Sequence, residues 1–195
     1  GVDFRFGKNL IGAFKNPALV VISETFLKTL PQRQVLNGFA EIFKHGLIRG
    51  SMFQEQWVQL KGFPKGLPDA IQQIVEESVA IKKAVVEKDP YEKHLRKILN
   101  FGHTIGHAIE AWNLQNGTEV LLHGEAIVAG MIMEAYIGTK VVENCTLDME
   151  NDILTTFRYF YKKLNFPENF ASEIYPFMTM DKKNAGGKIL AVVLK

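Results

Sequence analysis

The segment from Arg96 to Glu110, RKILNFGHTIGHAIE, restricts the fold of this chain more than any other. Arg96, Asn100, His103 and His107 follow one another at intervals of four, three and four residues, which places them on one face of an α-helix. The residues between them are mostly apolar and suit a helix that packs against a core. Such a stripe of one Arg, one Asn and two His predicts a site that holds a metal, binds an anion or moves protons.

Two further motifs add groups that bind metals. LLHGE at 121–125 supplies His123 immediately before an apolar run, and GFAEIFK at 38–44 places Glu41 and Lys44 three residues apart on a helical face. Imidazole and carboxylate groups together suit Zn²⁺ or a similar divalent ion, and three protein ligands with an open position are typical of a catalytic site. The spacing alone favours His103 and His107 as ligands on one helix, with hydrogen-bonded core histidines as the alternative.

Composition limits the remaining classes of function. The chain has 195 residues, 47% of them hydrophobic, and a formal net charge of +2 without a basic run, so we predict a genuine core and no binding of nucleic acid. A lone Cys145, with no secretory signal and no apolar stretch near ~20 residues, predicts a cytoplasmic protein that does not enter a membrane. The abrupt ends at Gly1 and Lys195 favour a piece of a longer protein.

Hydrophobic periodicity predicts a mainly α fold with two short peripheral strands. The strands are expected at 18–22 and 188–194, two short apolar runs that contain β-branched residues and follow turn-forming residues. Gly102 inside the histidine-bearing helix costs about 1 kcal/mol relative to Ala, which predicts a close approach or a break of the helix there. The predicted helices cover residues 31–49, 51–61, 68–88, 91–112, 123–142 and 148–164.

Five motifs, in this order, resemble the C-terminal domain of the 3-dehydroquinate synthase family. They are GKN at 7–9, GFAEIFKHGLI at 38–48, LRKILNFGHTIGHAIE at 95–110, HGEAIVAGM at 123–131 and MDKK at 180–183. The resemblance covers the whole chain, 1–195, as a multihelical metal- and substrate-binding domain. It is more specific for the sugar-phosphate cyclase superfamily than for one member. Family members bind NAD in an N-terminal doubly wound domain, and this chain has no glycine-rich dinucleotide fingerprint.

The resemblance also implies roles for individual residues. The expected ligands of a zinc or cobalt ion are Glu41, His103 and His123. His107 then supports that site or contacts the substrate phosphate. The expected substrate contacts are Lys44, Lys82, Arg96, Asn100 and Asn9, with Lys182 or Lys183 from the DKK motif. The expected edge of the NAD site is formed by Lys8, Phe26, Leu27, Lys28 and Thr29.

The implied reaction converts 3-deoxy-arabino-heptulosonate 7-phosphate into 3-dehydroquinate and phosphate, a step of the shikimate pathway. Family members are commonly homodimers, so we expect a homodimer, and we expect the chain without its NAD-binding half to be inactive. Asp89-Pro90-Tyr91-Glu92 departs from the Asp-Glu-x-Glu that members often carry, and the loop through 117–120 is longer than usual.

Three alternatives remain at this stage. One is another sugar-phosphate cyclase, such as 2-deoxy-scyllo-inosose synthase or a valiolone-type enzyme. A second is an alcohol or glycerol dehydrogenase of related fold, although the phosphate-binding cations argue against it. The third is a non-catalytic helical module with a structural metal.

Overall fold

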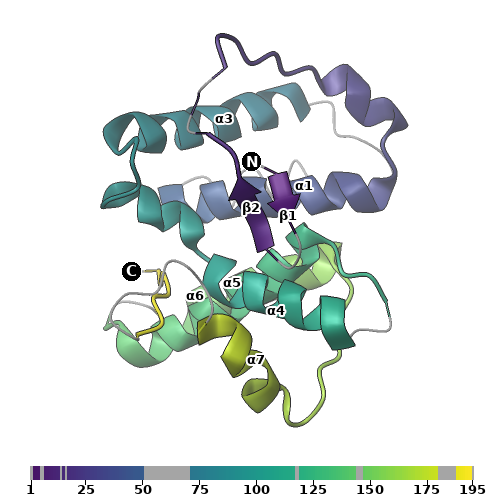
Figure 1. The fold of residues 1–195 in the computed structure, drawn as a ribbon, viewed down its shortest axis with the longest axis vertical. Helices are drawn as coiled ribbons and strands as arrows, with labels where there is room; N and C mark the ends of the chain where they lie inside the picture. Colours follow the sequence, from purple (N-terminus) through teal and green to yellow (C-terminus); the bar gives the residue numbers. More distant parts are fainter. Residues whose placement is uncertain are drawn as a thin grey trace.

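The computed structural model describes residues 2–4, 7–13, 15, 17–50, 71–116, 119–143, 147–179 and 188–194. Within these ranges the protein is mainly helical, as predicted (Figure 1). The α-helices are α1 (Gln32–Arg49), α3 (Ile71–Lys88), α4 (His103–Asn116), α5 (His123–Val141), α6 (Leu147–Phe160) and α7 (Phe170–Thr179). The 3-10 helices are η1 (Glu24–Thr29) and η3 (Leu95–Asn100), and strands β1 (Val2–Phe4) and β2 (Gly7–Ile11) pair antiparallel.

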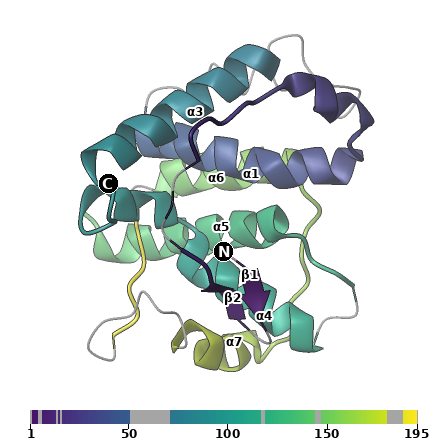
Figure 2. The same ribbon diagram turned by 45° about the horizontal axis from the view of Figure 1, so that its top comes forward.

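Helix α5 is the centre of the fold. It packs against α1, α4 and α6, while α3 covers the outer side of α1 and α7 lies against α4 (Figures 1 and 2). Every residue from 126 to 131 is buried, because the apolar run seen in the sequence leaves α5 no polar face there. Two clusters of buried side chains, one toward α1 and one toward α7, therefore meet along a single helix.

Several helix limits follow from local chemistry. Helix α1 begins at Gln32, directly after Pro31 and one residue later than predicted. Its last residue is Arg49, and Gly50 caps it in the left-handed conformation that glycine favours, with a φ of 78°. The described part of the predicted 68–88 helix is α3, and the 123–142 helix is α5, ending one residue earlier. Helix α6 stops at Phe160 rather than at residue 164. The predicted 51–61 helix lies outside the described residues.

Both predicted strands are wrong. Residues 18–22 form no strand, and Leu19, Val20 and Val21 are exposed. In the second segment only Lys188 makes an isolated bridge, and 189–194 has no regular structure, although Val192 and Leu194 pack against the core. Apolar runs of this kind need a partner strand to become a sheet, and none lies beside them among the described residues.

The predicted 91–112 helix is also wrong as one continuous element. The 3-10 helix η3 ends at Asn100, Phe101 and Gly102 form a turn, and α4 begins at His103. Gly102 has a φ of 77°, and a Cβ placed there would lie 2.2 Å from Met131 Cγ of α5. The glycine thus marks both a break and a close approach, the two readings that its position in the sequence left open.

Helix α7 was not predicted, because Pro176 lies inside it and removes one backbone donor. Among the helices of the described ranges, none has the length and apolar character needed to cross a membrane.

Replacing Gly102 with Ala tests the close approach of α4 to α5. The new Cβ would meet Met131 and the Ile127 carbonyl in a backbone conformation that Ala disfavours. We expect Gly102→Ala to lower the free energy of unfolding by about 2 to 4 kcal/mol, measured by urea titration of the full-length protein.

The matched control is Gly38→Ala on α1, where nothing lies within 4 Å of the added Cβ. It should raise the free energy of unfolding by about 0.5 to 1 kcal/mol, because Ala is the better helix former. Equal effects of the two substitutions would contradict this account of Gly102.

Candidate metal centre

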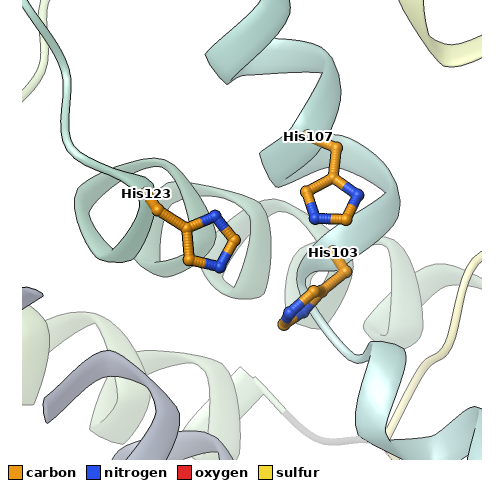
Figure 3. A group of neighbouring side chains, drawn as sticks. All are labelled: His103, His107 and His123. Carbon is orange, nitrogen blue, oxygen red and sulfur yellow. The ribbon is translucent and has the colours of Figure 1, made fainter. Parts of the chain in front are cut away.

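Three histidines from two helices meet at one place. His103 and His107 lie one turn apart at the start of α4, and His123 is the first residue of α5. One ring nitrogen of each lies within 4.8 Å of the others, and the rings point toward a common space (Figure 3). The close packing of α4 on α5 brings together residues that are twenty positions apart in the sequence.

Glu41 of α1 joins this cluster with one carboxylate oxygen. Its Oε1 lies 3.3 Å from His103 Nε2 and 3.9 Å from His123 Nε2. The oxygen is buried and accepts no well-directed hydrogen bond from the described residues. A buried carboxylate oxygen without a donor is costly, and a bound cation would satisfy it.

The opposite ring nitrogens of His103 and His123 both face oxygen acceptors. His103 Nδ1 lies 3.2 Å from the Phe101 carbonyl, and His123 Nδ1 lies 3.1 Å from Glu110 Oε2. Both nitrogens of each ring face oxygens that can only accept, since Glu41 Oε1 lies opposite the two Nε2 atoms. With a cation bound between Glu41 and the two Nε2 atoms, the proton of each neutral ring would lie on Nδ1. Each Nε2 then carries its lone pair toward Glu41 Oε1. Two imidazole nitrogens and a carboxylate oxygen form a donor set that fits a zinc-like ion.

The charges around Glu41 keep it ready to bind a cation. Lys44, with a side chain only 3% exposed, places Nζ 2.6 Å from Glu41 Oε2. Burial acts to raise the pKa of Glu41, but the contact with His103 and the charge of Lys44 outweigh it and hold this pKa well below its usual range. Burial also lowers the pKa of His103, which favours the neutral imidazole that a metal requires.

Helix α1 also fixes the beginning of α5. Arg33 of α1 donates from Nε and Nη2 to the two carboxylate oxygens of Glu125, each at 2.7 Å, and from Nη2 to the Val120 carbonyl at 2.8 Å. Asn37, one turn further along, accepts a hydrogen bond from the Gly124 amide. These bonds surround His123, so the helix that carries Glu41 also places His123 opposite it.

Comparison with known proteins shows which family the chain belongs to. The family model described as "3-dehydroquinate synthase C-terminal" matches residues 38–184, and the one described as "3-dehydroquinate synthase N-terminal" matches residues 1–37. The chain belongs to the 3-dehydroquinate synthase family. The resemblance to this family noted in the sequence is therefore confirmed, whereas the extent of the C-terminal domain over all of 1–195 stays a prediction, since residues 1–37 match the N-terminal model.

Relatives of known name show how much of the family's length this chain represents. A 3-dehydroquinate synthase of Parabacteroides distasonis is 39% identical over all of this chain and 54% of its own length. One of Dictyoglomus thermophilum is 38% identical over the same shares. The chain thus spans about half the length of the curated relatives it matches.

A solved structure gives an independent comparison. The 2-epi-5-epi-valiolone synthase of Streptomyces hygroscopicus, with NAD⁺ and Zn²⁺ bound, is 25% identical and superposes with a TM-score of 0.73. The match covers 91% of this chain and 49% of that one. The fold described here therefore also occurs in an enzyme named 2-epi-5-epi-valiolone synthase.

The predicted substrate residues come from three elements that pack together. Lys44 is buried on α1, Lys82 is exposed on α3, and Arg96 and Asn100 lie on η3, which packs against both helices. Arg96 Nη1 donates to the Pro90 carbonyl at 2.8 Å. Because η3 is separate from α4, Arg96 and Asn100 do not share a continuous helical face with the histidines. The predicted stripe of four residues on one helix is therefore wrong.

The other predicted residues are described only in part. Lys8 and Asn9 lie in β2, but their side chains, like Lys182 and Lys183, are outside what the structure describes. Phe26, Leu27, Lys28 and Thr29 form most of η1. There Phe26 is 78% exposed, whereas Leu27 packs against the core, so an NAD contact from this segment stays a prediction.

Three residues that contact the elements carrying the histidines, Glu110, Arg33 and Asn37, were not predicted from the sequence. Glu110 had a recognisable signal, because it lies seven residues after His103 and shares its helical face. Arg33 and Asn37 had none, since Glu125 lies 92 residues after Arg33 and Gly124 lies 87 residues after Asn37.

Asp89 organises the segment that carries Arg96. It is buried, and it accepts hydrogen bonds from the backbone amides of Lys93, His94 and Arg96 at 3.0, 2.7 and 3.0 Å. Burial acts to raise the pKa of Asp89, but these amides outweigh it and lower the pKa below its ordinary value. Asp89 therefore stabilises the fold above its unfolded-state pKa, and this contribution is lost as the pH falls through the lowered folded-state value.

Replacing Asp89 with Asn tests this arrangement. In urea titrations of the full-length protein at neutral pH, we expect a lower unfolding midpoint for Asp89→Asn than for the wild type. The difference should begin to shrink as the pH falls to about 4, the ordinary pKa of an aspartate, and should continue to shrink as the pH falls through the lowered folded-state pKa. A difference that stays constant over this range would contradict the role given to the carboxylate.

Proposed function

We propose that this chain supplies the metal- and substrate-binding half of an enzyme with 3-dehydroquinate synthase activity. The enzyme would convert 3-deoxy-arabino-heptulosonate 7-phosphate to 3-dehydroquinate and phosphate. The observation that carries this proposal is the convergence of the Nε2 atoms of His103 and His123 on the buried, donor-free Oε1 of Glu41. Membership of the family supports it, as do relatives of that name at up to 39% identity.

The ligands proposed for a zinc or cobalt ion are Glu41, His103 and His123. When bound, such an ion polarises substrate hydroxyls as a Lewis acid, and NAD carries out the oxidation and reduction. Lys44 binds the second oxygen of Glu41, and its charge keeps the ligand ionised. His107, one turn from His103 and facing the same space, is proposed to contact the substrate phosphate rather than to complete the ligand set.

The cationic residues of α1, α3 and η3 are proposed to bind the acidic groups of the substrate. A keto acid that also carries a phosphate offers two anionic ends, and Lys and Arg bind such groups through charge-assisted hydrogen bonds. Arg96 uses one guanidinium nitrogen on the Pro90 carbonyl, which orients the side chain while further donors of its planar fork remain available. Lys82 is exposed on α3 and is accessible to a ligand.

The complete protein is proposed to include an NAD-binding N-terminal half and to act in the cytoplasm as a homodimer. The 195 residues alone are then inactive, because the nicotinamide site is incomplete without that half.

Metal analysis of the full-length protein tests the ligand set. We expect Glu41→Ala, His103→Ala and His123→Ala to lose a bound zinc ion, because each removes one of three ligands. His107→Ala should keep the zinc, and so should the matched control His94→Ala, since His94 is exposed and outside the cluster. Loss of zinc from His107→Ala would instead show that His107 is a ligand, and zinc retained by Glu41→Ala would exclude Glu41.

A second cyclase activity is the alternative, because the solved structure that the chain resembles is named 2-epi-5-epi-valiolone synthase and not 3-dehydroquinate synthase. We expect the full-length protein with NAD and zinc to release phosphate from the keto-acid sugar phosphate and to form 3-dehydroquinate. Sugar phosphates without a carboxylate should be poor substrates, because one anionic end is missing. Preferred turnover of those substrates would assign a different cyclase, and NAD-dependent turnover by the 195-residue chain alone would contradict the proposed division of the site.

A further inference from the structure

Glu110 connects the two helices that carry the histidines. It lies on the same face of α4 as His103 and His107, and its Oε2 reaches His123 Nδ1 of α5 at 3.1 Å. The carboxylate side chain is only 13% exposed. The other nitrogen of the His123 ring faces Glu41 Oε1 at 3.9 Å. His123 is thus held between two carboxylates, one on each ring nitrogen.

We propose that Glu110 is a positioning residue for His123. It holds the ring proton on Nδ1 and fixes the ring plane, so that the Nε2 lone pair is directed at the metal position between Glu41 and His103. This inference rests on the proposed function, because it takes His123 as a metal ligand. A carboxylate that accepts from the outer nitrogen of a ligating imidazole also makes that imidazole a stronger donor.

Among the described residues, His123 has a carboxylate at its Nδ1 and His103 has a backbone carbonyl there, and the exposure of the two side chains accounts for this difference. The His103 side chain is 12% exposed, so packing restricts its ring, and the Phe101 carbonyl is a sufficient acceptor for its Nδ1. The His123 side chain is 38% exposed and lies at the first residue of a helix, where water competes for its nitrogens. A charged acceptor forms the stronger bond that this more exposed ring needs.

The charge and the oxygen of Glu110 can be separated by substitution. Glu110→Ala removes the acceptor, and we expect it to weaken Zn²⁺ binding by the full-length protein about 10- to 100-fold in a chelator competition. Glu110→Gln keeps an acceptor oxygen without the charge, so its loss should be clearly smaller. In Co²⁺-loaded protein, the visible absorption of Glu110→Ala should differ from that of the wild type even when the metal saturates the site.

A matched control comes from the other end of α4. Glu173 of α7 accepts a hydrogen bond from Trp112 Nε1 at 2.7 Å, so Glu173→Ala removes a carboxylate that braces the same helix away from the histidines. We expect its Zn²⁺ affinity and Co²⁺ spectrum to match those of the wild type.

The possible results separate the two proposals. Wild-type affinity in Glu110→Ala, together with metal loss in His123→Ala, would overturn the role of Glu110 and leave the ligand set intact. Equal weakening in Glu110→Ala and Glu173→Ala would also overturn it, because the effect would then be one of helix stability. Metal retained by His123→Ala would refute the ligand set and this inference together. If Glu110→Ala does not fold, wild-type affinity and spectrum in Glu110→Gln would count against the need for a charged acceptor.

Discussion

The close contact between α4 and α5 is the constraint on which the rest of the structure depends. A Cβ at Gly130 of α5 would lie 2.1 Å from the Gly102 carbonyl, so the two backbones approach as only glycine permits. The fully buried Glu134 of α5 accepts hydrogen bonds from the amides of Gly102 and Ile105, which satisfies donors at the start of α4. His103 begins α4 at this contact. The same packing that forms the core therefore also sets the distance between His103 and His123.

Helix α1 adds a carboxylate to the candidate metal centre, and the ion pair that holds this carboxylate is not explained by the stability of the fold alone. The buried Lys44 and the part-buried Glu41 form an ion pair, and replacing a pair shielded from water with apolar side chains is often neutral or stabilising. Here the pair leaves one carboxylate oxygen directed at two imidazole nitrogens. Arg33 meanwhile donates from Nε and Nη2 of its guanidinium to the Glu125 carboxylate and so holds the beginning of α5. A fold selected only for stability has little use for this arrangement, whereas a cation site needs an ionised carboxylate at a fixed position.

The sequence predicted the helices better than the connections between them. The runs that became α1 and α5 carried strong periodicity or continuous apolar character, so their limits agreed within about two residues. The strand at 18–22 failed because β-branched composition says nothing about whether a partner strand is present. The histidines were found by spacing and motif, but Glu110 owes its role to the direction of one ring in α5. A sequence pattern indicates which face of a helix a residue occupies. The contact of Glu110 with His123 depends in addition on which side chain of the neighbouring helix lies opposite that face.

Part of the proposed substrate site lies apart from the proposed metal ligands, although Lys44 and His107 lie beside them. The proposed ligands lie on α1, α4 and α5, whereas Lys82, Arg96 and Asn100 belong to α3 and η3. Glu92, in the segment between α3 and η3, has a φ of 56°, an unfavourable value outside glycine, and accepts a hydrogen bond from Asn100 at 2.6 Å. Strain at a residue that orients a proposed substrate contact is typical of functional sites. A common metal centre with a separately built anion-binding segment would let related cyclases share one chemistry and differ in substrate, so we expect specificity to be determined mainly by residues 89–100.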